Sequence, residues 1–192
     1  MTPPGNEPRP RRTLLLIAAV ALAPIVASYA AYYGFRPARR TNYGELLQTA
    51  PAPRVTGLDA NGHAFSLADL RGQWVLLVVS PEACAEACAR ALYATRQART
   101  IQGQEQDRVA RVLLQTPAAS PLAPELAAAH PKLAVVRADA AELARLPLDA
   151  RAAAGILLLD PRGNLVLRYG ADPDIRRLAD DLQRVLKASQ IG

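Results

Sequence analysis

Hydrophobic residues are distributed very unevenly along the chain. Residues 13–35 form a 23-residue stretch without a charged side chain. As a helix this stretch would be roughly 35 Å long at about 1.5 Å per residue, which is enough to cross a hydrocarbon layer of about 30 Å. The pattern therefore predicts one transmembrane helix over residues 13–35.

Two interpretations of this segment remain open. Tyr29 and Tyr33 lie near its end, where an interfacial aromatic belt would lie. The small residues Ser28 and Ala30 would also suit cleavage of a signal peptide. We favour a retained anchor, because the apolar run is long for a signal peptide.

The rest of the chain divides by composition. Residues 1–12 are a short arm, which makes insertion with a cytoplasmic N-terminus the simpler topology. Residues 36–53 contain three prolines and little periodicity, and predict a tether before a folded domain at residues 54–192. The chain has 21 Arg against 2 Lys, a bias associated with GC-rich bacterial genomes. We expect a single-pass protein of the bacterial inner membrane with its C-terminal domain in the periplasm.

Within the domain, strand and helix patterns alternate. Residues 74–79 are continuously apolar, as in a strand buried on both faces, and residues 174–188 carry apolar positions at helical spacing. Strands are expected at residues 55–58, 64–66, 74–79, 109–114, 133–137, 156–159 and 165–169, and helices at residues 81–102, 125–130, 140–146 and 174–188. This order predicts an α/β protein with a thioredoxin-like fold, a central mixed β-sheet flanked by helices.

The positive charge argues against a nucleic-acid partner once it is divided by region. The formal net charge is +6, but residues 1–40 alone carry +5 and residues 41–192 only +1. A nucleic-acid-binding domain would concentrate the charge on its folded surface. The basic residues instead flank the apolar segment, so we expect the membrane as a partner and no nucleic acid.

The only two cysteines, Cys84 and Cys88, follow the expected strand 74–79 and fall in the first turns of the expected helix 81–102. On a helix this spacing puts both thiols on one face, with Cβ atoms about 5–6 Å apart. A disulfide prefers about 3.8 Å, so it requires the first turn to loosen. One Cu(I) ion between the sulfurs requires less distortion, because thiolates select this soft ion.

The residues around the pair bear on its reactivity. Ser80 followed by Pro81 is typical of a helix start, and the helix dipole favours a thiolate near that end. Glu82 and Glu86 oppose this effect, and Arg90 partly offsets them. The alternative is a purely structural disulfide, but so short a loop restrains the unfolded chain little. We therefore favour a functional pair.

Three segments carry a family resemblance: residues 67–75 (LADLRGQWV), residues 84–88 (CAEAC) and residues 156–163 (ILLLDPRG). With the anchor, they resemble the Sco/SenC family, thioredoxin-like membrane proteins that help to assemble the copper centre of cytochrome c oxidase. The resemblance implies that Cys84 and Cys88 are the catalytic residues and the Cu(I) ligands. It implies an oxidase subunit, or another redox or copper protein, as the partner.

The chain departs from the family pattern at the third copper ligand, a His before the Asp-Pro-x-Gly turn. Residues 148–154 contain no His, and we interpret His63 and His130 as surface residues. Two thiolates suit Cu(I) but suit Cu(II) poorly. The missing His therefore favours thiol–disulfide exchange, with Cys84 attacking and Cys88 resolving. The alternative is a non-catalytic, membrane-tethered interaction module with a degenerate site, so oxidoreductase activity stays open.

Overall fold

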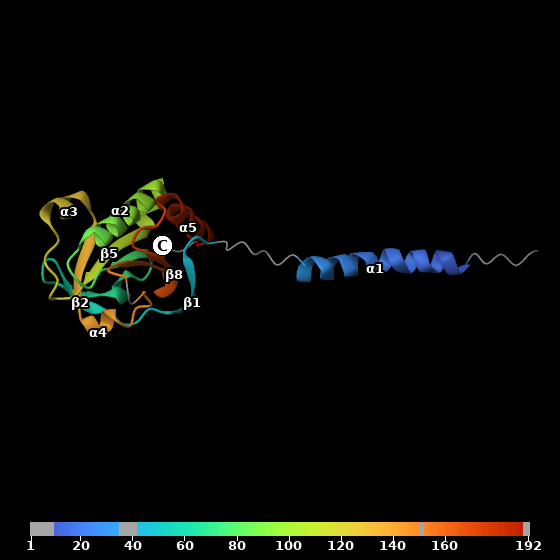
Figure 1. Ribbon diagram of the computed structural model, residues 1–192, viewed down its shortest axis with the longest axis horizontal. Helices are drawn as coiled ribbons and strands as arrows, with labels where there is room; N and C mark the ends of the chain where they lie inside the picture. Colours follow the sequence, from blue (N-terminus) through green and yellow to red (C-terminus); the bar gives the residue numbers. More distant parts are fainter. Residues whose placement is uncertain (1–9, 35–41, 150–151, 190–192) are drawn as a thin grey trace, which may run out of the picture. The chain divides into compact units, whose positions relative to one another are not determined.

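The computed structural model describes residues 10–34, 42–149 and 152–189 (Figure 1). The chain divides into two compact units, Met1–Thr41 and Asn42–Gly192. In the first unit, α1 (Pro10–Gly34) includes Pro24 and covers most of the expected apolar helix. Its residues Arg11–Ala31 are long and apolar enough to cross a membrane, which fits single-pass anchoring.

An eight-stranded sheet forms the centre of the second unit. Its strands are β1 (Glu45–Pro51), β2 (Thr56–Asp59), β3 (Ala64–Ser66), β4 (Trp74–Val79), β5 (Val109–Gln115), β6 (Leu133–Ala138), β7 (Gly155–Leu159) and β8 (Asn164–Gly170). They lie in the order β1-β8-β7-β4-β5-β6-β2-β3. The central strands β4, β5 and β6 are parallel, and the other neighbours are antiparallel. The sheet is therefore mixed, as the sequence predicts.

Helical segments cover both faces of the sheet. The long helices α2 (Glu86–Ile101) and α5 (Ile175–Ala188) lie side by side on one face (Figure 1). The other segments are short: η1 (Leu67–Leu70), η2 (Gly103–Arg108), α3 (Pro124–Ala129) and α4 (Ala140–Leu143). Two apolar cores result, one beneath α2 and α5 and one beneath η1 and α4.

Strand β1 corrects the expectation that residues 36–53 form a tether. Glu45–Pro51 pairs antiparallel with β8 and closes one edge of the sheet. Only Leu47 among its residues is partly buried. An edge strand held mainly by main-chain bonds shows little apolar alternation, so its pattern resembles that of a linker. Residues 36–41 lie outside the described part of the chain.

Candidate functional site

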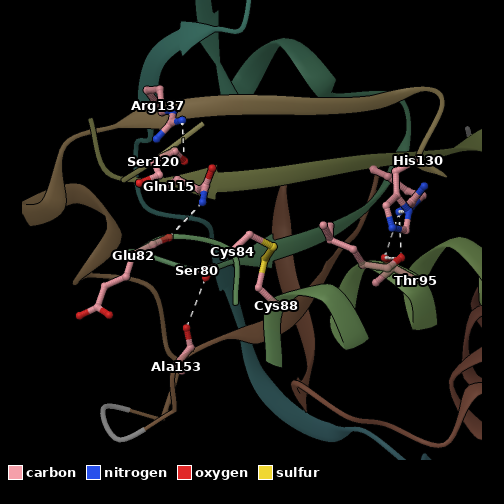
Figure 2. Close-up of a disulfide and its surroundings, with 12 residues drawn as sticks. Ser80, Glu82, Cys84, Cys88, Thr95, Gln115, Ser120, His130, Arg137 and Ala153 are labelled. Carbon is pink, nitrogen blue, oxygen red and sulfur yellow. Dashed lines mark hydrogen bonds between the residues drawn. A yellow bond between two sulfur atoms is a disulfide. The ribbon is translucent and has the colours of Figure 1, made fainter. Parts of the chain in front are cut away.

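Cys84 and Cys88 form a disulfide at one end of the sheet (Figure 2). Val79, the last residue of β4, pairs with Leu114 near the end of β5 and with Gly155 at the start of β7. The segment after β4 therefore begins where β5 ends and β7 begins. The fold places the cysteine pair where three central strands meet the first turn of α2.

The structure corrects the expected start of the long helix. α2 begins at Glu86 with Ala85 as its N-cap, five residues later than the sequence predicts. Cys84 therefore lies before the helix, while Cys88 lies in its first turn. The two Cα atoms are 5.1 Å apart, within the range of a disulfide. The bond forms because one cysteine is outside the helix.

Contacts from β5 explain why the segment before α2 is not helical. Thr116 donates its main-chain N–H (3.1 Å) and its hydroxyl (2.6 Å) to the carbonyl oxygen of Pro81. The Gln115 side-chain amide donates to the carbonyl oxygen of Glu82 at 3.0 Å (Figure 2). These bonds hold residues 81–82 against the end of β5. We call Gln115 and Thr116 the β5 clamp.

The two sulfur-bearing residues differ in exposure. Cys88 is 1% exposed and belongs to the apolar core beneath α2 and α5. Cys84 packs against the same core but is only half-buried. A reactant approaching from solvent therefore meets Cys84 first.

Charged side chains lie close to the disulfide in the sequence. Glu82 and Glu86 are exposed. Glu86 is paired with Arg90, which also contacts Asp172 at 3.3 Å. Exposed pairs of this kind contribute little to stability. They do pair Arg90 with Glu86, one of the two acids that it was expected to offset.

The histidines do not complete a metal site with the cysteines. Among the described residues, no group of three or more His, Cys, Asp or Glu side chains is arranged to hold a metal ion. His63 is exposed in the β2–β3 hairpin and contacts Asp59. His130 was expected at the surface but is 5% exposed and contacts Arg111, so that expectation is wrong.

The sequence interpretation missed the β5 clamp. Gln115 and Thr116 follow the expected strand 109–114, and Gln115 is 0% exposed. The available signal was a polar residue directly after the apolar run of residues 112–114. Its partner Glu82 is 33 positions away, so local patterns could not reveal the contact.

A mixed sheet flanked by helices, with a disulfide at the junction between β4 and α2, is the arrangement of a thioredoxin-like protein, and the comparisons confirm this predicted fold. The chain belongs to the family of transmembrane-like, thioredoxin-like C-terminal domains, whose model matches residues 74–189. Comparison with curated protein sequences finds no match.

Solved structures share the fold, and Sco proteins are among them, as the resemblance predicts. Bradyrhizobium japonicum ScoI with copper bound is 22% identical with a TM-score of 0.52, covering 70% of this chain and 99% of that chain. Yeast Sco1 with copper bound is 15% identical with a TM-score of 0.60, and the match covers 74% of this chain and 96% of that chain. A Chlorobium tepidum protein assigned as the thiol:disulfide interchange protein DsbE is 17% identical with a TM-score of 0.57. This match covers 74% of this chain and 99% of that chain. At these identities the likeness establishes the fold.

Proposed function

We propose that the protein is a membrane-anchored, Sco-like thiol–disulfide exchange protein that assists cytochrome c oxidase assembly. The observation that carries the proposal is the unequal exposure of the disulfide: Cys84 is half-buried and Cys88 is fully buried. An exchange reaction needs one sulfur that partners reach, and a buried second sulfur directs their attack to the first. A purely structural bridge needs no such difference.

The proposed reaction uses the two cysteines in turn. When the pair is reduced, the Cys84 thiolate attacks one sulfur of a partner disulfide, forms a mixed disulfide and releases the other partner sulfur as a thiolate. The Cys88 thiolate then attacks the Cys84 sulfur, which closes the Cys84–Cys88 bond and releases the second partner thiolate. Two electrons pass to the partner. In reverse, the same steps oxidise a partner dithiol.

Copper handling is the second candidate function. It is favoured by structural neighbours that were solved with copper bound. In the reduced protein, Cys84 and Cys88 would be the two ligands, and thiolates suit Cu(I). Copper would be the cargo, passed to another copper protein. A Cu(II) form is disfavoured, because no His lies within residues 148–154.

The proposed location follows from α1 and the family. An apolar N-terminal helix and a transmembrane-like family domain fit an anchor. We place the domain on the periplasmic face of a bacterial inner membrane, because disulfides persist in oxidising compartments. The partner would then be an oxidase subunit or another redox or copper protein at that face.

The proposal is tested by Cys84→Ser in the full-length chain, in a bacterial host that depends on it for oxidase assembly. The matched control is Ala83→Ser at a neighbouring exposed position. We expect a several-fold loss of assembled oxidase with Cys84→Ser, at an unchanged amount of the chain in the membrane, and no loss with the control. Wild-type oxidase levels with Cys84→Ser would instead identify a non-catalytic interaction module.

A further measurement separates exchange from copper handling. The reduced full-length protein in detergent is titrated with Cu(I) under anaerobic conditions. One Cu(I) per chain, lost in Cys84→Ser, would support copper handling. A protein that exchanges with glutathione but retains no Cu(I) would support exchange alone.

A further inference from the structure

The main-chain carbonyls of Pro81 and Glu82 have two alternative sets of donors. If α2 began at Pro81, as Ser80-Pro81 predicts, these oxygens would accept from the N–H groups four residues later, at Ala85 and Glu86. In the structure the carbonyl oxygens of Pro81 and Glu82 accept from the β5 clamp instead, and the Ala85 N–H donates to the carbonyl oxygen of Ala83. The Pro81 carbonyl already accepts two bonds, the capacity of its two lone pairs, so the clamp and an extended α2 compete for it. The Glu82 carbonyl accepts one bond, and Gln115 holds it towards β5 rather than towards the N–H of Glu86.

The outcome of this competition determines the distance between the cysteines. Four residues of α-helix advance about 6 Å along the axis. The Cα atoms of Cys84 and Cys88 are 5.1 Å apart, because Cys84 lies outside the helix. If α2 extended to Pro81, both cysteines would be helical and their Cβ atoms would be about 5–6 Å apart. That separation disfavours the disulfide relative to the dithiol.

Gln115 is the buried member of the clamp. Its side chain is 0% exposed, and its Nε2 donates to the Glu82 carbonyl, while its Oε1 has no hydrogen-bond partner among the residues that the structure describes. A buried amide with an unsatisfied oxygen costs stability relative to an apolar side chain of similar size. The fold therefore bears an energetic cost at the position that holds the segment before Cys84.

We propose that Gln115 is a positioning residue for the cysteine pair. By holding the Glu82 carbonyl against β5, it keeps Cys84 out of α2 and stabilises the disulfide relative to the dithiol. This inference rests on the proposed function, in which the pair cycles between the two states. The Gln115 side chain bonds to the Glu82 carbonyl and not to a sulfur in the described structure, so it acts through the main chain of residues 82–84.

The test compares Gln115→Met with Gln102→Met in the full-length protein in detergent. Methionine keeps a similar volume and removes the amide donor. Gln102 is the matched control, because its amide donates to the carbonyls of Ala98 and Ala179 at the other end of α2. Each protein is equilibrated in buffers of reduced and oxidised glutathione, and the disulfide fraction is measured by alkylation and mass spectrometry.

We expect Gln115→Met to lower the equilibrium constant for disulfide formation by about tenfold, which is a potential about 30 mV less negative. Gln102→Met should keep the wild-type constant. A constant for Gln115→Met equal to that of the control overturns the inference and leaves the exchange function intact. A wild-type pair that does not exchange with glutathione overturns both.

A second variant covers the case in which Gln115→Met does not fold. Thr116→Val keeps the shape of the side chain and removes the hydroxyl donor to Pro81. The same mechanism predicts a shift in the same direction and of smaller size, about threefold in the equilibrium constant. Without such a shift, the β5 clamp does not control the stability of the disulfide.

Discussion

The carboxylate of Asp181 in α5 accepts a 2.8 Å hydrogen bond from the main-chain N–H of Gly44, 137 positions earlier in the chain. Asp181 is 1% exposed and also accepts from the N–H of Tyr43 and the hydroxyl of Tyr169. The Arg177 guanidinium lies over the Tyr43 ring at 5.2 Å. These contacts fix the start of the folded domain to its last helix.

Removing the Asp181 carboxylate should therefore destabilise the domain. We expect Asp181→Ala to lower the free energy of unfolding by about 3 kcal/mol, because it leaves buried donors without an acceptor. The exposed neighbour Asp180 provides the control, and Asp180→Ala should change the value by less than about 0.5 kcal/mol. The chain has one tryptophan, the buried Trp74, whose fluorescence in urea reports domain unfolding. Equal midpoints for the two variants would contradict the prediction.

His130 should make the fold sensitive to acid. Burial, with the nearby cations Arg111 and Arg96, lowers the pKa of His130 from 6.5 to about 4. The unfolded chain thus binds more protons than the folded chain between these values, so stability falls as the pH drops through this window. From pH 7 to pH 5 this loss is at most about 2 kcal/mol.

The contribution of His130 is isolated by comparing two asparagine variants. His130→Asn keeps an acceptor for Arg111 and should remove this part of the pH dependence. His63→Asn changes the exposed histidine and should leave the dependence as in the wild type. The measurement is Trp74 fluorescence in urea at pH 5 and pH 7. If both variants retained the wild-type difference, His130 would not be its source.

Arg111 should be replaceable by an apolar residue. Arg111 is 4% exposed, and its guanidinium contacts Leu92, Thr95 and His130, while its Nε has no hydrogen-bond partner within the described part of the chain. Because a buried charge without a carboxylate is costly, Arg111→Met should leave the free energy of unfolding within about 1 kcal/mol of the wild type or raise it. It should also raise the pKa of His130, which NMR titration measures. A loss above about 3 kcal/mol with an unchanged His130 titration would contradict this.

Reduction of the disulfide should leave the domain folded. The cysteines are four positions apart, so the bond restrains a very short loop and contributes about 2 kcal/mol by chain entropy. We expect a modestly lower urea midpoint in excess reductant, with buried Trp74 fluorescence retained in buffer. Unfolding on reduction alone would indicate a structural bridge rather than an exchange pair.

The sequence predicted the central strands well because they are buried on both faces. Residues 74–79 form β4 with the expected bounds, and residues 109–114 form all but the last residue of β5. The expected strands at residues 55–58 and 64–66 form β2 and β3, joined by a turn with Gly62 at a positive φ of 83°. In these segments the hydrophobic pattern of the sequence matches the burial of the residues in the folded domain.

Two expectations failed because distant contacts overrode local signals. Ser80-Pro81 is a favourable helix start, but the β5 clamp takes the carbonyl oxygens that the first turn would use. β1 lacks an apolar pattern, and its place in the sheet depends on pairing with β8 and on Asp181. The cysteine pair could thus be found from the sequence, whereas the geometry that permits its disulfide could not.

The central claim is that Cys84 is the sulfur that partners reach and Cys88 the sulfur that resolves. Its most direct test is a mixed-disulfide trap in the full-length protein. Reduced Cys88→Ser and Cys84→Ser variants are mixed with oxidised glutathione, and the adduct is followed by mass spectrometry. We predict that Cys88→Ser forms a lasting adduct at Cys84 at least tenfold faster than Cys84→Ser forms one at the buried Cys88. Equal rates, or faster reaction at Cys88, would contradict the account.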